Sequence, residues 1–343
     1  MVVKFLVLPE FVKVNKLLIE DMLGLKKGDK MLILTSADVP YDIAESAQIY
    51  AESIGIESYI LNTFPQSKKN LPNKIVTSIA KEMDGIYLLS GWNSIDFKEI
   101  VNHKIPLIYI GGAPGIDECL IRTMIHVDIY KLKEEAWKIA NAFTEAKTVR
   151  ITSKQGTDYI EDIDGVYGEA LCGFACDPMG TPWEYVPPAC PGIVENKKGK
   201  SNGKVVFDAY ISGIGVLREP VTVYVEEGKI INIEGGRQAE EFRQLIESFD
   251  KSNFNFPVEW GIGTNPNARL ISPSGRILIE WERVRGTVHI GMGDFQPYPV
   301  FHEGKLVNPE WKPAKYHCDG MIWAPTIYLD DKLIVKDGFI QKF

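Results

Sequence analysis

The sequence has few cysteines and histidines and no long apolar run. Each of these two residue types occurs five times in 343 residues, and the cysteines have neither the spacing of a disulfide framework nor that of a zinc finger. The first apolar stretch is broken by Lys4, Glu10 and Lys13, and no cleavage site follows it. We therefore expect no signal peptide, no transmembrane span and a cytoplasmic location.

Clusters of positive charge are also missing. The formal net charge is −8, and the longest basic run is the short turn NKKGK at 196–200. Nucleic acids and anionic membrane surfaces need a basic footprint on the protein that binds them. The sequence therefore argues against both classes of partner, and we expect a small peptide or another small molecule as the substrate.

The chain up to residue 146 alternates apolar strands with amphipathic helices. Uninterrupted apolar strands of this kind lie in parallel sheets that helices cover on both faces. No G-x-G-x-x-G motif follows the first strand, which argues against a dinucleotide-binding domain. The predicted strands are 30–37, 57–62, 85–91 and 105–112. A first helix is predicted before residue 30, and further helices at 41–56, 73–84, 94–103 and 129–146.

From residue 147 onward, polar and apolar residues alternate between Gly, Asn and Asp turns, a pattern typical of antiparallel strands. We therefore predict an α/β N-terminal domain with a parallel sheet at 1–146, followed by an antiparallel α+β domain at 147–343 that carries the candidate metal-binding residues. Strands or hairpins are predicted at 203–215, 220–236, 275–293 and 326–340, and one helix at 239–252.

Three residues of the second domain are candidate metal ligands. His317 and Asp319 are two positions apart in YHCDG, so on a strand their side chains leave the same face. An imidazole and a carboxylate together suit zinc, iron, cobalt or manganese. His289 lies in GTVHIGMGD, where glycines leave room for a ligand. Taken one at a time, a strand with two polar residues and a core histidine remain open explanations.

Two glutamates have unusually apolar neighbours in the sequence. Glu184 lies between Trp183 and Tyr185, and Glu259 directly precedes Trp260. A carboxylate enclosed by apolar side chains loses its hydration, which is costly unless a cation or a hydrogen-bond donor meets it. A metal ion and a shielded salt bridge would each meet this need.

Six segments after residue 146 occur in the order found in one enzyme family. In this order they resemble the C-terminal domain of the thermophilic metallo-aminopeptidases of the aminopeptidase T and S type. The resemblance covers about residues 147–343 and implies a hydrolase that releases N-terminal residues from peptides. The segments are WEYVPPACPG, SNGKVVFDAYISGIG, VYVEEGKIINIEGG, VEWGIGTNPNARL, GTVHIGMGD and YHCDG.

The resemblance also implies a metal site. The implied cofactor is one or two divalent ions of zinc, cobalt, manganese or iron, and two ions about 3.5 to 4 Å apart can hold a hydroxide nucleophile and polarise a carbonyl. Glu259 would bridge the two ions, and Glu184 or Glu259 would handle the proton. Position by position, the family's ligands fall on Glu184, Glu259, His289, His317 and Asp319.

The sequence departs from the aminopeptidases at two positions. Gln296 stands where the family has a tyrosine, and its amide offers a donor to an oxyanion but no phenolic proton. Val284 stands where the family has an acidic residue. Peptide hydrolysis is therefore less well supported than metal binding.

A related branch, the 2,5-dihydroxypyridine 5,6-dioxygenases, is similar in the same domain and has a first domain closer in size to this one. Its members hold one iron(II) ion with two histidines and an aspartate. A histidine takes the position of Glu259 there, so the glutamate favours the hydrolase. His289, His317 and Asp319 nevertheless provide a possible iron triad.

The sequence thus predicts a metal-dependent hydrolase resembling aminopeptidases, with Glu184, Glu259 and Gln296 as catalytic residues. A mononuclear non-haem iron(II) ring-cleaving dioxygenase is the alternative. A binding protein whose metal site has decayed is a third possibility. A homodimer is implied by the resemblance alone.

Overall fold

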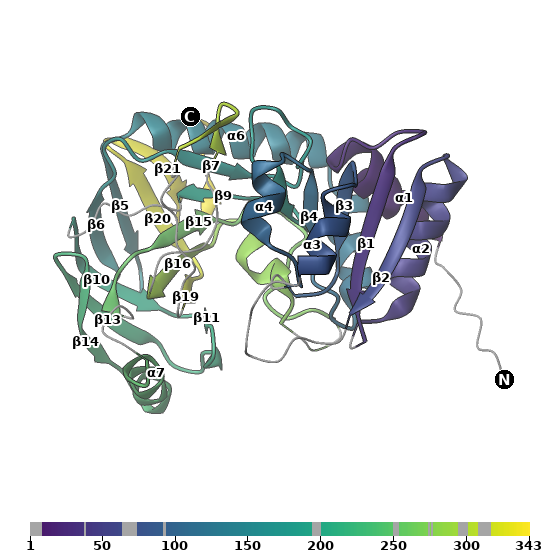
Figure 1. The fold of residues 1–343 in the computed structure, drawn as a ribbon. Helices are drawn as coiled ribbons and strands as arrows, with labels where there is room; N and C mark the ends of the chain where they lie inside the picture. The colour runs from purple at the N-terminus through teal and green to yellow at the C-terminus, as the bar shows by residue number, and fades with distance from the viewer. Residues whose placement is uncertain are drawn as a thin grey trace.

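The computed structural model shows a mixed α/β fold with one parallel sheet and several antiparallel sheets. The early elements form one end of the molecule and the later antiparallel strands form the other, and helix α6 (Ile129–Glu145) runs along both (Figure 1). The structure describes residues 9–37, 39–63, 74–91, 94–193, 200–249, 254–273, 275, 277–293, 301–307 and 317–343.

The first part of the chain alternates strands and helices, and each of its four predicted strands overlaps an observed one. The short π-helix η3 and helix α5 were not predicted. The elements are α1 (Pro9–Lys16), η1 (Leu17–Met22), β1 (Lys30–Ser36), α2 (Tyr41–Ser53), β2 (Glu57–Thr63), α3 (Lys74–Ala80), β3 (Gly85–Leu88), α4 (Phe97–Asn102), β4 (Leu107–Tyr109), α5 (Ile116–Leu120), η3 (Ile121–Ile125) and α6.

A five-stranded parallel sheet, in the order β2-β1-β3-β4-β8, forms the core of this part. Met31 and Ile33 of β1 pack in the cluster that contains residues of α1 and α2, whereas Leu32 and Leu34 pack in the cluster that contains residues of α3 and α4. The apolar strand therefore buries both faces, which confirms the predicted parallel sheet covered by helices on both sides.

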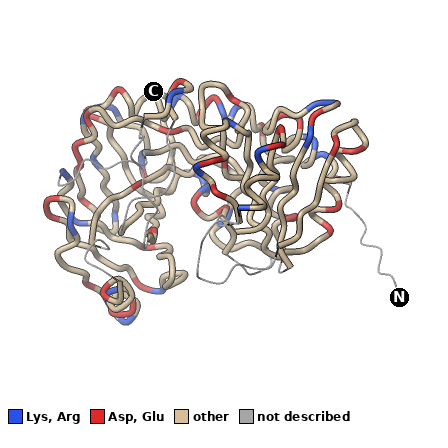
Figure 2. The backbone as a smooth tube through the Cα atoms, viewed as in Figure 1, with Lys and Arg blue, Asp and Glu red and all other residues tan. Residues whose placement is uncertain are grey.

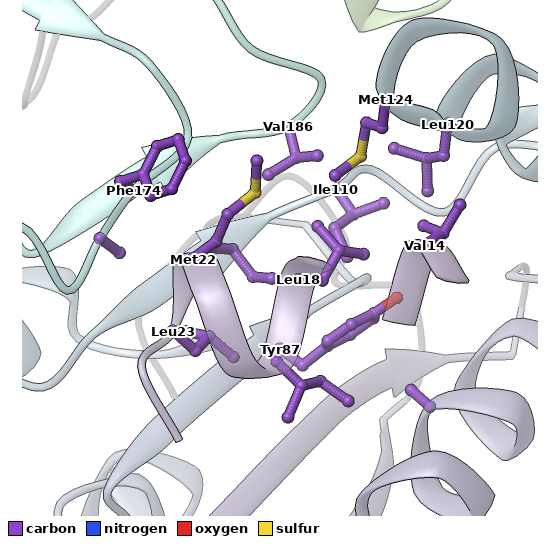
Figure 3. Close-up of a cluster of buried hydrophobic side chains, with 14 of the residues drawn as sticks. Val14, Leu18, Met22, Leu23, Tyr87, Ile110, Leu120, Met124, Phe174 and Val186 are labelled. Atoms are coloured by element: carbon purple, nitrogen blue, oxygen red, sulfur yellow. The ribbon is translucent and has the colours of Figure 1, made fainter. Parts of the chain in front are cut away.

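The fifth strand of this sheet comes from a later part of the chain. Strand β8 (Trp183–Tyr185) pairs in parallel with β4, with Tyr185 opposite Tyr109. Figure 3 shows Phe174 and Val186 in the same buried cluster as Leu18 and Met22. Segments on both sides of residue 146 thus share a core, and the division into two domains at that residue stays a prediction.

The rest of the chain is rich in antiparallel strands. Helix α7 (Arg237–Glu247) confirms the one helix predicted there. The strands are β5 (Thr148–Ser153), β6 (Asp158–Asp162), β7 (Gly168–Leu171), β9 (Cys190–Ile193), β10 (Ser201–Phe207), β11 (Tyr210–Ile211), β12 (Gly215–Val216), β13 (Val221–Glu226), β14 (Lys229–Glu234), β15 (Glu259–Ile262), β16 (Val288–Gly293), β17 (Phe301–His302), β18 (Lys305–Leu306), β19 (His317–Ile322), β20 (Pro325–Leu329), β21 (Lys332–Lys336) and β22 (Phe339–Ile340).

Two large sheets enclose the second core. One has eight strands in the order β14-β13-β10-β6-β5-β20-β21-β22, and the other has seven in the order β12-β11-β19-β16-β15-β9-β7. Apolar residues of both sheets share one cluster with Phe143 of α6 and Phe242 of α7. The ring of Phe143 meets Trp260 of β15 edge-on at 4.6 Å between centroids, so α6 fixes the seven-stranded sheet from one side.

The predicted strand at 275–293 is wrong in its first half. Residues Ile279–Arg283 form a short 3-10 helix, η5, and only β16 follows as a strand. The reason is the fully buried Glu280, whose carboxylate accepts two hydrogen bonds from Arg122, at 2.8 and 2.9 Å. This ion pair between distant segments outweighs the alternating pattern.

Charged side chains are spread over the molecule. Figure 2 shows Lys and Arg interspersed with Asp and Glu along the chain, with both signs on helix α7. Among the described residues, no helix combines the length and the hydrophobicity that crossing a bilayer would require.

Candidate metal centre

Three neighbouring strands of the seven-stranded sheet bring the candidate ligands together. Strand β16 lies between β15 and β19, and Gly291 of β16 is paired with Glu259 on one side and with Asp319 on the other. Residues that face each other across antiparallel strands point to the same side of a sheet, and so do residues two apart. Glu259, His317 and Asp319 therefore share one face.

The ligand atoms of these three side chains converge. Nε2 of His317 lies 2.9 Å from Oδ1 of Asp319 and 3.3 Å from Oε1 of Glu259. The side chains are between 11% and 15% exposed, so a small ligand can still reach them. In the part of the chain that the structure describes, this is the one group of three or more such residues whose ligand atoms all lie within 4.8 Å of one another.

Gly291 keeps the space between the ligands open. A Cβ atom at this position would lie 2.6 Å from Cγ of Glu259, 2.7 Å from Cε1 of His317 and 3.1 Å from Oδ1 of Asp319. Any residue other than glycine would therefore crowd all three ligands. The bare backbone leaves room for an ion where a side chain would otherwise stand.

The opposite face of the same strands is apolar and anchors the ligands. Trp260, Ile290 and Cys318 alternate with the polar residues and are buried in the core between the two sheets. Polar and apolar residues thus alternate along these strands as the sequence predicts. The apolar face holds the strands in place, and the polar face presents the candidate ligands.

The electrostatics of the group favour a bound cation. Burial lowers the pKa of His317, but the charges of Asp319 and Glu259 outweigh it and hold this pKa well above its usual value. Burial raises the pKa of Asp319, and the His317 charge outweighs it in turn. Two carboxylates close to one imidazole thus make a nearby positive charge favourable, and a divalent ion would supply it. Oxygen and imidazole donors suit iron(II), manganese or zinc.

His289 lies beside this group but outside it. Its Nε2 atom is 4.0 Å from Oε1 of Glu259, and its Nδ1 atom is 3.7 Å from Sγ of Cys190. Trp281 of η5 meets the imidazole edge-on at 5.9 Å between centroids.

Glu184 is held elsewhere. It lies on β8 of the parallel sheet, is 1% exposed, and accepts a hydrogen bond from the backbone N–H of Gly173 at 3.0 Å. Burial raises the pKa of Glu184 to about 8, against the opposing effect of that hydrogen bond. The structure does not bring this residue into the close group of ligands. Gln296, the third predicted catalytic residue, lies outside the described residues.

Sequence reasoning missed two charged residues near the site. Glu169 of β7 is 2% exposed, and neither of its carboxylate oxygens has a hydrogen-bond partner among the described residues. Burial raises the pKa of Glu169 well above its usual value, and the charges of Glu184 and Glu259 add to this effect. Arg283 of η5 is 1% exposed. The sequence feature that could have indicated Glu169 is a lone carboxylate between two small residues, Gly168 and Ala170, in a short strand.

Comparison with known proteins decides the family. The family model of the 2,5-dihydroxypyridine 5,6-dioxygenases, NicX, matches residues 117–342. The chain belongs to this dioxygenase family. The match includes all three residues of the close group and His289, so the site described above lies within the shared part of the sequence.

Solved structures share the fold over almost the whole chain. A 2,5-dihydroxypyridine dioxygenase from Pseudomonas putida KT2440 superposes with a TM-score of 0.79 at 16% identity, over 97% of both chains. AmpT from Thermus thermophilus superposes with a TM-score of 0.64 at 13% identity, over 97% of this chain and 99% of that one. A search of curated protein sequences gives no significant match. Both resemblances inferred from the sequence, to the dioxygenases and to the aminopeptidases, are confirmed.

Proposed function

We propose that the protein is a mononuclear iron(II) dioxygenase that opens a small hydroxylated aromatic ring. Membership of the dioxygenase family supports this choice over the hydrolase predicted from the sequence. The observation that carries it is the compact group of Glu259, His317 and Asp319, the one such group among the described residues, with Glu184 held in another sheet. Three donors on one side of an ion leave its other positions free for oxygen and substrate.

The ligand set differs in one respect from the two-histidine, one-carboxylate triad of many iron(II) oxygenases. Glu259 here takes the place of a histidine, and His289 is the nearest additional imidazole. We infer that His317, Asp319 and Glu259 hold the ion. His289 would orient the carboxylate of Glu259, because its Nε2 atom faces that carboxylate at 4.0 Å.

A bound iron(II) ion would allow electrons to pass from the hydroxylated ring to dioxygen, which otherwise reacts with it only slowly. The residues of the chain would hold the ion beside the bare backbone of Gly291 and would transfer protons. Glu184 has a pKa of about 8 and therefore carries its proton at neutral pH. A buried carboxylic acid in this state can donate a proton to a substrate oxygen but is a poor ligand for a cation.

The hydrolase remains the second candidate because the fold is shared with AmpT. A two-ion hydrolase needs a second set of ligands about 3.5 to 4 Å from the first ion. The carboxylate of Glu184 already accepts a backbone hydrogen bond, which leaves it less available for that purpose.

The homodimer, the two-domain division and the cytoplasmic location are predictions that rest on the sequence.

Metal analysis followed by two activity assays tests the proposal. Protein purified without added metal is analysed for its elements, loaded with iron(II) under nitrogen, and given 2,5-dihydroxypyridine with dissolved oxygen. We expect one iron per chain and one oxygen molecule consumed per ring opened. Two ions per chain, release of amino acids from aminoacyl amides and no oxygen uptake would favour the hydrolase.

A matched pair of variants controls this experiment. Asp319→Asn removes a carboxylate from the close group, and we expect it to lose most of the bound iron and of the oxygen uptake. Asp331→Asn makes the same change at an exposed position and is expected to match the wild type in both assays. Equal iron content in the two variants would contradict the proposed ligand set.

A further inference from the structure

Helix η5 is rigidly fixed against the rest of the molecule. The carboxylate of Glu280 is fully buried and accepts hydrogen bonds from both terminal nitrogens of Arg122 and from the backbone N–H of Arg269, the last at 2.8 Å. A fork of this kind between a guanidinium and a carboxylate is strong and directional. The residues that follow Glu280 are therefore held in one position.

The same short helix lies along the candidate metal centre. Trp281 packs edge-on against the ring of His289, and the thiol of Cys190 donates a hydrogen bond to the backbone carbonyl of Glu282 at 3.3 Å. Cys190 belongs to β9, which pairs with the ligand strand β15. Helix η5 is thus attached directly to the strands that carry the ligands.

Arg283 is the last residue of η5, and one edge of its guanidinium has no hydrogen-bond acceptor among the described residues. Its Nη1 atom donates to the carbonyl of Ile279 at 3.1 Å and contacts the carboxylate of Glu282. The guanidinium carbon lies 5.1 Å from the ring centroid of Tyr185, which fixes its position further. Among the described residues, none accepts a hydrogen bond from Nε or Nη2. These two nitrogens form one of the edges with which arginine binds a carboxylate in a two-point contact.

The charge of Arg283 acts on the site itself. Burial raises the pKa of Asp319 and that of Glu184 on β8; the charge of Arg283 opposes this effect at both residues, at Asp319 together with the charge of His317. Its partner Glu282 is 25% exposed, so solvent screens that negative charge more than it screens the buried guanidinium. Two ligand carboxylates would also neutralise a divalent ion.

We propose that Arg283 binds a carboxylate on the substrate, so that the protein acts on hydroxylated aromatic rings that carry an acidic substituent. This inference rests on the proposed ring-opening function and narrows its substrate class. The ring would lie beside Tyr185 and Tyr109, whose rings meet edge-on at 5.7 Å at the ends of β8 and β4. Its hydroxyl groups would face the metal ligands.

The other arginines near the site are engaged or exposed. Arg285 donates from both terminal nitrogens to Glu135 of α6, one of them also to the carbonyl of Thr264. Arg269 has an exposed side chain. Of these three arginines, Arg283 is the one that is 1% exposed and has two guanidinium nitrogens without an acceptor among the described residues.

Binding of two matched probes tests this role without any turnover. The probes are 2,5-dihydroxybenzoate and hydroquinone, which differ only by the carboxylate, and titration calorimetry follows their binding to iron-loaded protein with oxygen excluded. We expect the wild type to bind the benzoate about 10 to 100 times more tightly. Arg283→Gln should reduce this preference to less than about threefold, while hydroquinone affinity stays the same.

Two further variants keep the test decisive. Arg283→Lys keeps the charge but loses the two-point contact, so an intermediate preference is expected. Arg285→Gln removes an arginine already paired with Glu135 and should keep the full preference. An unchanged preference in Arg283→Lys and in Arg283→Gln would overturn the proposal, and so would a wild type without any preference. If Arg283→Gln does not fold, the lysine variant decides alone.

The outcome is distinguishable from a failure of the proposed function. A wild type that prefers the carboxylate probe but consumes no oxygen would overturn ring opening and leave the role of Arg283 intact. Oxygen-dependent ring opening without any preference for the carboxylate probe would support the proposed function and overturn the role of Arg283.

Discussion

Glu259 and Glu184 have similar neighbours in the sequence and different surroundings in the structure. Glu259 stands at the start of β15, with its carboxylate 3.3 Å from the imidazole of His317. Glu184 lies in the parallel sheet, 1% exposed, with a backbone N–H as its partner. The carboxylate of Glu259 thus faces another candidate ligand, whereas burial raises the pKa of Glu184 to about 8. Apolar flanking residues indicate burial but do not identify the partner.

The difference follows from the strands that the two glutamates join. Strand β15 pairs with β16, and β19 follows on the other side of β16, so three strands of one sheet bring the ligands together. Strand β8 pairs instead with β4 of the parallel sheet. We therefore expect the two glutamates to respond differently to the same substitution.

The largest expected effect is on metal affinity. Glu259→Gln removes a charged ligand, so iron affinity should fall by more than the 10- to 100-fold typical of changes outside the ligand set. Glu184→Gln should change the affinity by less than about threefold. Competition with a chromogenic chelator measures both. Equal losses in the two variants would restore the two-ion site implied by the aminopeptidase resemblance.

A second substitution tests the space between the ligands. Gly291→Ala would place a methyl group 2.6 Å from Cγ of Glu259 and 2.7 Å from Cε1 of His317. We expect a loss of iron affinity of about 10- to 100-fold, similar to the effect of disturbing ligand orientation. Gly91→Ala is the control, because a Cβ atom there meets nothing within 4 Å. Unchanged iron binding in Gly291→Ala would show that the ion lies elsewhere.

Much of the fold could be predicted because it depends on local patterns. The apolar run of β1 and the alternation around His317 and Asp319 each indicate which faces are buried. The 3-10 helix at Ile279–Arg283 could not be predicted in this way. It depends on the ion pair between Glu280 and Arg122, which are 158 positions apart in the sequence. Neighbouring residues carry no information about such a pair.

The candidate site, too, could be predicted only where local patterns indicate it. His317, Asp319 and Glu259 were named from residue type and spacing together with a family resemblance, and the structure places them within one group. Arg283 was missed because its position depends on η5, where an extended strand was expected. Tyr185, whose ring the guanidinium of Arg283 contacts, lies on β8 of the parallel sheet, and only the tertiary structure brings the two residues together.

Another buried glutamate, on a strand of the eight-stranded sheet, gives the smallest expected effect. Glu161 of β6 is 1% exposed and accepts a hydrogen bond from the hydroxyl of Tyr159 at 2.9 Å. Burial raises its pKa from 4.5 to about 8. The folded protein thus keeps this proton up to about pH 8, while the unfolded chain loses it near pH 4.5, so stability falls as pH rises between these values.

Glu161→Gln should remove this part of the pH dependence. The slope attributable to one proton is at most about 1.4 kcal/mol per pH unit. Urea unfolding at pH 5, 6.5 and 8 measures it, and Glu226→Gln, at an exposed position, is the control. The glutamine variant should lose less stability between pH 5 and pH 8 than the control does. Equal losses in the two variants would mean that Glu161 is ionised in the folded protein.

Anomalous diffraction at the iron absorption edge, from crystals grown with iron(II) under nitrogen, tests the central claim most directly. A single peak is expected for each chain, within bonding distance of Glu259, His317 and Asp319 and away from Glu184. Two peaks about 3.5 to 4 Å apart, or one peak bonded to Glu184, would contradict the mononuclear site.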